Sequence, residues 1–207
     1  MAAASAQSVK NEITLRGSVE IVTEFFGYAI NSILYQRGVY PPDSFASVAK
    51  YGLSVLVTSD EGLKGYLMQV LRQLADWLAR GEVQKLVVVI TGVESKEVLE
   101  RWVFNIDTDK AAMLPGQART KSHKEIQGEI SAIVRQITAS VTFLPLLEEP
   151  CTFDLLVYTN ADSAVPVAWE ESDPRYIATS SEVRLRSFTT SIHKVAPSVS
   201  YKDPGAK

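Results

Sequence analysis

The stretch VQKLVVVITGVESKEVLERWVFNI, residues 83–106, gives the strongest structural signal in the chain. Its first part, Val83 to Ile90, is rich in β-branched residues, and in its second part, Glu97 to Ile106, apolar and polar residues alternate. The residues between them, Thr91-Gly92 to Ser95-Lys96, have the composition of a turn. Two strand-like runs joined by a short polar segment predict a β-hairpin. We therefore expect this hairpin to belong to the fixed core of the fold.

Three amphipathic helices are predicted around the hairpin. From Val9 to Arg37 apolar residues recur every three or four positions, until a pair of prolines stops the helix and a loop follows. Asp60 is placed to cap a second helix, whose leucine-lined face continues to Gly81. A third helix is expected from about Lys124 to Thr142, with Val141 among its inward residues.

The C-terminal part of the chain has a different character. Thr152 to Thr159 reads as one short strand of high β-propensity, whereas the chain beyond Asn160 mixes turn-rich stretches with strand-like segments at Tyr176 to Ala178 and Val183 to Val195. In the last of these, neither face is purely apolar. A strand whose two faces are alike is weakly held in register, so more than one pairing partner is conceivable for it. The polar stretch from Asp107 to Lys124 is expected to be a mobile loop.

Composition limits the function classes. The chain has 207 residues, a formal charge of −3, 46% hydrophobic residues and a single cysteine, Cys151. These figures are typical of one soluble globular domain in a reducing compartment. Neither a signal peptide nor an apolar run of about 18 residues is recognisable, and no basic stripe indicates a nucleic-acid binder. We therefore expect neither a membrane nor a nucleic acid as a partner.

Few residues point to catalysis. Cys151, His123 and His193 are too few for a structural zinc site, and the chain has no glycine-rich phosphate loop. We expect neither a metal nor a cofactor, and we interpret His193 as a hydrogen-bonded strand histidine. An enzyme that combines Asp or Glu with His193 stays open as an alternative. Trp169, in a loop, is expected to dock either on the protein itself or on a partner.

Several segments spread along the chain share one family pattern. They are ITLRGS at 13–18, FF at 25–26, NSILYQRG at 31–38, KYGL at 50–53, VQKLVVVI at 83–90, VLERW at 98–102, ITA at 137–139, VTFLPLL at 141–147 and EVRLRSFTT at 182–190. Together they resemble the HORMA domain of the mitotic arrest-deficient two family of spindle-checkpoint proteins. The chain departs from the family pattern at its first ten residues, at Lys110 to Lys121, and at Ala196-Pro197-Ser198 with the extreme tail. These departures suggest a distant member, from a plant.

The resemblance implies an α+β HORMA domain. In such a domain, three helices pack on a mostly antiparallel sheet, and a mobile C-terminal segment called the safety belt changes its pairing. Carried onto this sequence, residues 1–11 are a flexible N-terminus, residues 12–207 are the HORMA domain and residues 160–207 are the belt. The belt residues singled out by this correspondence are Trp169, Val183, Leu185, Phe188, Ile192, His193 and Val195.

The resemblance further implies a non-enzymatic clamp with an open and a closed state. On closing, Val183 to Val195 moves to pair beside the strand Glu97 to Ile106, and Leu15 packs differently in the two states. A partner peptide is then held as an added strand along the edge formed by Phe153, Leu155, Val157 and Tyr158. An open and a closed copy dimerise through a surface that contains Arg135, Gln136, Phe143 and Arg186.

The partners implied are those of the spindle assembly checkpoint. They are a mitotic arrest-deficient one-type kinetochore receptor, the co-activator of the anaphase-promoting complex, a checkpoint kinase complex, a remodelling AAA+ ATPase with its HORMA adaptor, and a second copy of the chain. The implied location is the nucleus and cytoplasm, with the kinetochore and spindle in mitosis and the nuclear envelope in interphase. Within the same fold, an adaptor of translesion polymerase or of the meiotic chromosome axis stays open as an alternative.

Overall fold

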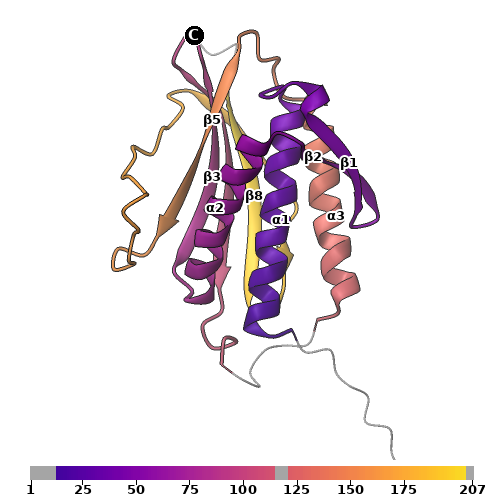
Figure 1. Cartoon of the computed structure of the whole chain (residues 1–207), viewed down its shortest axis with the longest axis vertical. Coiled ribbons are helices and arrows are strands. Elements are labelled where there is room, and N and C mark those ends of the chain that lie inside the picture. The colour runs from indigo at the N-terminus through magenta and orange to yellow at the C-terminus, as the bar shows by residue number, and fades with distance from the viewer. Residues whose placement is uncertain (1–12, 115–120, 204–207) are drawn as a thin grey trace, which may run out of the picture.

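A computed structural model of the chain describes residues 13–114 and 121–203. Within these ranges, three helices cover one face of an antiparallel sheet with the strand order β5-β3-β4-β8-β6, and β7 pairs with β8 (Figure 1). A separate hairpin joins β1 and β2. The elements are α1 (Leu15–Gln36), η1 (Pro42–Ser44), β1 (Phe45–Lys50), β2 (Leu53–Thr58), α2 (Glu61–Ala79), β3 (Val83–Gly92), β4 (Val98–Thr108), α3 (His123–Ala139), η2 (Ser140–Thr142), β5 (Cys151–Thr159), β6 (Ser180–Arg184), β7 (Phe188–Thr189) and β8 (His193–Lys202). The expected α+β class is confirmed.

The helices begin where side chains satisfy their first backbone amides. Asp60 accepts a hydrogen bond from the amide of Leu63 and caps α2, as predicted. Thr14 caps α1 in the same way, so this helix begins at Leu15 rather than at the predicted Val9. Residues 9–12, like the predicted flexible terminus 1–11, lie outside the described ranges.

The third helix is shorter than predicted. A capping box between Ser122 and Glu125 starts α3, which ends at Ala139 and continues as the 3₁₀ turn η2. Because this turn changes the helical period, Val141 is 44% exposed, and its predicted inward position is wrong. None of the helices in the described part of the chain is long and apolar enough to cross a membrane.

The predicted hairpin is confirmed as the antiparallel pair β3 and β4, in the middle of the sheet. On the helix side, Trp102 and Phe104 of β4 are fully buried. The Phe104 ring meets Phe25 and Phe26 of α1 at centroid distances of 5.9 and 5.5 Å, in edge-on geometry. This aromatic cluster ties α1 to the sheet and forms the centre of the core.

The hairpin β1–β2 was not predicted, because the region before Asp60 was expected to be a loop. The turn between the two strands is Tyr51-Gly52, with φ values of 52° and 69°. Two consecutive residues in the left-handed region are typical of the tight turn that matches the twist of a hairpin. Tyrosine is an unusual residue at such a position, which concealed the turn in the sequence.

The pairing of the C-terminal segment differs in detail from the expectation. The strand that lies beside β4 is β8, with Thr108 opposite His193 and Glu100 opposite Tyr201. The predicted segment Val183–Val195 is instead broken into β6, a short β7, a turn and the start of β8, and both β6 and β7 pair with β8. Its last three residues, His193–Val195, lie beside β4 as expected, but the expectation is wrong for residues 183–192.

Pro197 explains where β6 ends. It lies in β8 opposite Phe104, and its carbonyl accepts a hydrogen bond from the amide of Leu185 at 3.0 Å. In an antiparallel pair the same residue would also donate its N–H to Leu185, but proline has none. Regular pairing therefore stops at Arg184, directly before Leu185, and the chain leaves the ladder until β7.

Candidate functional site: a sheet edge beneath the C-terminal belt

The predicted peptide edge is an edge strand of the sheet. Within the described residues, β5 pairs only with β3. Phe153, Leu155 and Val157 lie on the helix side and pack against the core. Tyr158 lies on the opposite face, where the ammonium group of Lys85 is 4.2 Å from its ring centroid. The outer edge of β5 therefore presents its backbone away from the sheet, as strand addition requires.

A cavity of about 500 Å³ lies against this edge. Its walls come from α2, from the middle of β5 and from the segment 168–175. The Tyr66 hydroxyl of α2 accepts a hydrogen bond from the backbone amide of Leu155, and burial together with the nearby Asp154 raises the pKa of the phenol. A neutral tyrosine thus occupies the position at which a partner strand would meet the Leu155 amide.

The segment after β5 runs first along α2. The rings of Trp169 and Trp77 meet at a centroid distance of 5.0 Å in edge-on geometry. The Trp77 indole also donates a hydrogen bond to the carbonyl of Ala164 at 3.0 Å. Trp77 of α2 is 2% exposed, so this anchor belongs to the core. Of the two possibilities left open for Trp169, the structure shows docking on the protein itself.

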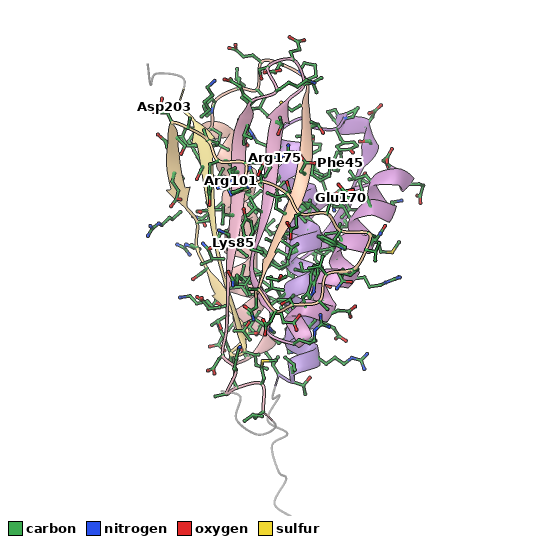
Figure 2. All side chains as sticks on the ribbon, turned by 90° about the vertical axis from the view of Figure 1, so that its left-hand side faces the viewer. Phe45, Lys85, Arg101, Glu170, Arg175 and Asp203 are labelled. Atoms are coloured by element: carbon green, nitrogen blue, oxygen red, sulfur yellow. The ribbon has the colours of Figure 1, made fainter. Side chains whose placement is uncertain are left out.

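The segment then crosses the sheet on the face opposite the helices (Figure 2). Arg175 forms an ion pair with Asp154 of β5 at 3.0 Å. Tyr176 lies over the guanidinium of Arg101 in β4, 4.7 Å from the ring centroid. Arg101 is 7% exposed, and its Nε and Nη2 atoms have no hydrogen-bond partner. Together these contacts close a loop of chain around the outer edge of β5.

The last part of the chain is anchored in the core between α1 and α2. Phe188 is buried against Phe25 at a centroid distance of 4.9 Å, and Ile192 and Val195 are also buried. His193 is fully buried; its Nδ1 lies 2.7 Å from the Ser18 hydroxyl and its Nε2 lies 3.3 Å from the carbonyl of Leu78. Burial lowers the pKa of His193, because the imidazolium would lose its hydration, although the Leu78 carbonyl opposes this shift.

Two side chains of α3 hold backbone amides of the belt. Gln136 accepts a hydrogen bond from the amide of Arg186 at 2.7 Å, and Glu129 accepts one from the amide of Thr189 at 3.1 Å. The structure thus brings together two members of the predicted dimer surface, Gln136 and Arg186, within one chain. The other two, Arg135 and Phe143, are exposed.

The remaining predicted residues are half-buried. Val183 and Leu185 of the belt pack against the core, and Leu15 lies in the first turn of α1. Sequence reasoning missed the contacts made by Arg101, Arg175 and Tyr176. No local sequence pattern indicates these contacts, because each of them joins two residues that are at least twenty positions apart. The described residues contain no group of His, Cys, Asp and Glu able to hold a metal ion.

Comparison with known proteins now decides the family. The HORMA domain family pattern matches residues 18–193. The mitotic spindle assembly checkpoint protein MAD2A of Dictyostelium discoideum is 62% identical over 200 residues, which cover 96% of this chain and 97% of that protein. Human MAD2A is 62% identical over 192 residues, covering 93% and 94%. The chain belongs to the MAD2 family of HORMA-domain proteins.

A solved structure agrees with this assignment to the MAD2 family. One chain in the crystal structure of the mitotic checkpoint complex superposes with a TM-score of 0.81 at 48% identity, and the match covers 90% of this chain and 99% of that one. Like its MAD2 relatives, the chain is a spindle assembly checkpoint protein and not an enzyme.

Two sequence-based expectations concern the plant origin of the chain and the translesion alternative. The suggestion of a distant member from a plant is not supported, because MAD2 of Zea mays is 52% identical, below the 62% of the amoebal and human proteins. The translesion alternative is represented by the DNA polymerase zeta processivity subunit of Schizosaccharomyces pombe, at 29% identity over 165 residues. The higher identity to the MAD2 proteins therefore favours the MAD2 family over the translesion alternative.

Proposed function

We propose that the chain acts in the checkpoint as a clamp, which adds a partner peptide as a strand on the outer edge of β5 and retains it beneath the belt. One observation carries this proposal: the segment 160–179 passes around the unpaired edge of β5, anchored at Trp77 on one side and at Asp154 and Arg101 on the other. A strand seated in the adjoining 500 Å³ cavity would be enclosed by chain.

The enclosure accounts for slow release. Strand addition draws affinity from backbone hydrogen bonds, each contributing about 1 kcal/mol net. Escape also requires the belt to break its own contacts, and these are lost together in the barrier. Apparent affinity is reduced by the fraction of molecules in the binding-competent arrangement, so a helper that raises this fraction acts as an activator.

The proposal includes a second arrangement of the belt. With β8 on β4, the present structure corresponds to the arrangement that the family resemblance calls closed. In the open arrangement, the C-terminal segment would leave β4 and cover the edge of β5. Leu15 lies one turn before Ser18, the partner of His193, which supports its assignment as a position that senses the change.

The proposed partners follow from the family. Related chains occur in the mitotic checkpoint complex, and we propose that this chain joins such a complex by clamping the co-activator of the anaphase-promoting complex. A mitotic arrest-deficient one-type receptor would present it at kinetochores, with the checkpoint kinase complex, and an AAA+ ATPase with its HORMA adaptor would reopen it. The corresponding location is the nucleus and cytoplasm, with kinetochore and spindle in mitosis and the nuclear envelope in interphase.

Self-association is proposed through Arg135, Gln136, Phe143 and Arg186. The hydrogen bond between Gln136 and the Arg186 amide supports a surface that depends on the position of the belt. The double substitution Arg135→Glu with Gln136→Ala should abolish dimers in light scattering. Arg135→Glu alone keeps the hydrogen bond between Gln136 and the belt and should leave peptide capture intact. A double variant that still dimerises would refute this surface.

Strand addition is tested with a receptor peptide whose backbone amides are N-methylated one at a time. Only alternate amides of an added strand bond to its neighbour, so binding should fall at every second position. Loss without this alternation would refute strand addition. Retention is tested by deleting the last ten residues, which removes the second half of β8, residues 198–202. The truncated protein should release the peptide rapidly; retention equal to that of the full chain would refute the belt.

A further inference from the structure

A second groove beside the belt lies at the end of the sheet where β8 ends, and it shares no lining residue with the β5 cavity. It has a volume of about 820 Å³. Its walls come from three segments: the β3–β4 turn with the start of β4 (residues 94–100), the segment 145–149 before β5, and the end of β8 (residues 201–203). Figure 2 shows Asp203, the last of these residues, at this end of the sheet. We call this feature the composite groove.

One wall of the composite groove comes from the belt, and the other two come from segments outside it. The first two segments lie outside the belt and form what we call the core half of the groove. Tyr201, Lys202 and Asp203 reach the groove only because β8 lies on β4, with Tyr201 opposite Glu100. If β8 leaves β4, one wall of the groove leaves with it. The complete groove is therefore a property of the arrangement with β8 docked.

The floor of the composite groove is rigid and electrically compensated. Glu100 forms a buried ion pair with Arg37 at 2.5 Å and accepts a hydrogen bond from the Trp102 indole at 3.1 Å. Arg37 also donates to the carbonyl of Pro145, which fixes the 145–149 segment. Buried charges paired and hydrogen-bonded in this way hold a surface in one shape before any ligand arrives.

The rim of the composite groove is acidic. It carries the carboxylates of Glu94, Glu148, Glu149 and Asp203, of which Asp203 accepts a hydrogen bond from Ser181. The lysine of the groove, Lys202, is paired with Glu97. Glu149 accepts hydrogen bonds from the amides of Glu94 and Ser95. Hydrogen bonds from Ser95 and Glu94 lower the pKa of Glu149, so this carboxylate stays charged.

An apolar strip runs between these carboxylates. Leu146 is 85% exposed, which makes it the most exposed leucine among the described residues, and Leu99 and Tyr201 line the same groove. Apolar side chains inside a charged rim are typical of a protein-binding surface. The acidic rim favours cationic ligands and disfavours anionic ones.

We propose that the composite groove docks a short segment of a partner protein that carries apolar side chains flanked by Lys or Arg. The partner recognises the arrangement in which β8 lies on β4. Since it binds that arrangement in preference to any other, it also stabilises it, in proportion to the difference in affinity. This inference rests on the proposed change of belt pairing, but it concerns a surface separate from the edge of β5.

The test uses the full chain and a fluorescent synthetic peptide in which leucine and arginine alternate, with glutamate in place of arginine in the control peptide. Anisotropy should rise with the basic peptide alone. Amide shifts in NMR spectra should gather at residues 94–99, 146–149 and 201–203. Binding of both peptides, or shifts elsewhere, would overturn the proposal.

Variants distinguish the two halves of the groove. Leu146→Asp should weaken binding of the basic peptide about tenfold, through loss of apolar contact and burial of a charge. Glu148→Lys in the core half and Asp203→Lys in the β8 half should each weaken it about threefold, as expected for charges that are at least partly exposed. Glu61→Lys, which reverses an exposed charge on α2, is the matched control and should leave binding unchanged. An effect confined to the core half would refute the composite site.

Two further measurements separate this proposal from the clamp. All four variants should retain a receptor peptide at β5 as the parent does. If the parent itself failed to retain this peptide, the result would count against the clamp and not against the composite groove. A disulfide between Asn105→Cys and Ala196→Cys, which face each other across β4 and β8, should hold β8 in place when Cys151 is replaced by Ser. The oxidised protein should bind the basic peptide at least as well as the reduced one; weaker binding would overturn the inference.

Discussion

The core elements and the belt are held in place in different ways. In α1, β3 and β4, apolar residues recur at the period of their element, and the aromatic cluster around Phe104 packs them into one core. The belt, residues 160–203, pairs with this core only where β8 lies on β4. Its other attachments are individual contacts, among them one tryptophan pair, the Phe25–Phe188 ring contact, two ion pairs, one cation–π contact, one buried histidine and two hydrogen bonds from α3. A region held by many equivalent contacts resists single changes, whereas a region held by a few individual ones can be released by them.

The largest test of this difference is Phe188→Ala. Removing a buried phenylalanine costs about 3 kcal/mol or more. Because Phe188 is the belt's main apolar anchor on Phe25, we expect amide hydrogen exchange in β8 to accelerate by at least about a hundredfold, with little change in β3. Phe25→Ala is the matched control and should accelerate both strands. Equal acceleration of β3 and β8 by Phe188→Ala would show that belt and core unfold as one unit.

The second test is acidification. The pKa of His193 in the folded chain lies below its ordinary value of 6.5, so the unfolded or released belt binds a proton more strongly. Stability of the docked belt is therefore complete above about pH 6.5 and falls as the pH is lowered through the folded-state pKa. A single proton limits this loss to about 1.4 kcal/mol per pH unit.

The pH effect is measured as hydrogen exchange of β8 between pH 7 and pH 5, corrected for the intrinsic exchange rate. His193→Asn keeps a polar side chain beside Ser18 but does not titrate, and it should flatten the pH dependence. If the variant and the parent show the same slope, another group is responsible.

A smaller effect is expected at Tyr176. Its ring covers the Arg101 guanidinium, a contact worth about 1 kcal/mol, so Tyr176→Ala should release a bound receptor peptide about fivefold faster. Tyr176→Phe keeps the ring and should behave as the parent. Coupling in a double-mutant cycle with Arg101→Met would assign the effect to this pair, and strict additivity would exclude it.

The smallest effect is expected at Arg175. Its ion pair with Asp154 is partly exposed on both sides, so its loss should cost less than about 1 kcal/mol. Arg175→Ala should accelerate peptide release about twofold in low salt and not in 1 M salt, where the charges are screened. Breaking the exposed pair Arg16–Glu20 on α1 is the matched control and should not change release. A salt-independent effect of Arg175→Ala would point to packing instead.

The parts of the fold that could be predicted from the sequence are those whose signals are local. Asp60 followed by regularly spaced leucines identified α2, and the β-branched run before Ile90 identified β3. The hairpin β1–β2 escaped because its turn uses a tyrosine with positive φ. The break between β6 and β7 escaped because it depends on Pro197, a residue of another strand.

The candidate site also has features that could be predicted from the sequence and features that could not. The strand β5 follows from its composition, its edge position was implied only by the family resemblance, and the weak register of the tail was visible as two similar faces. The contacts of Arg101, Arg175 and Tyr176 were not visible, since each joins residues of unrelated segments. The composite groove likewise needs three distant segments at one end of the sheet.

The sequence by itself determined the three helices, the hairpin β3–β4 and the strand β5, and which of them bury an apolar face, because periodicity and capping act over a few residues. Only the tertiary structure decided which strand β8 accompanies and which side chains hold the belt over β5. Those choices depend on contacts between residues far apart in the chain, and a segment with two similar faces carries no local preference among them.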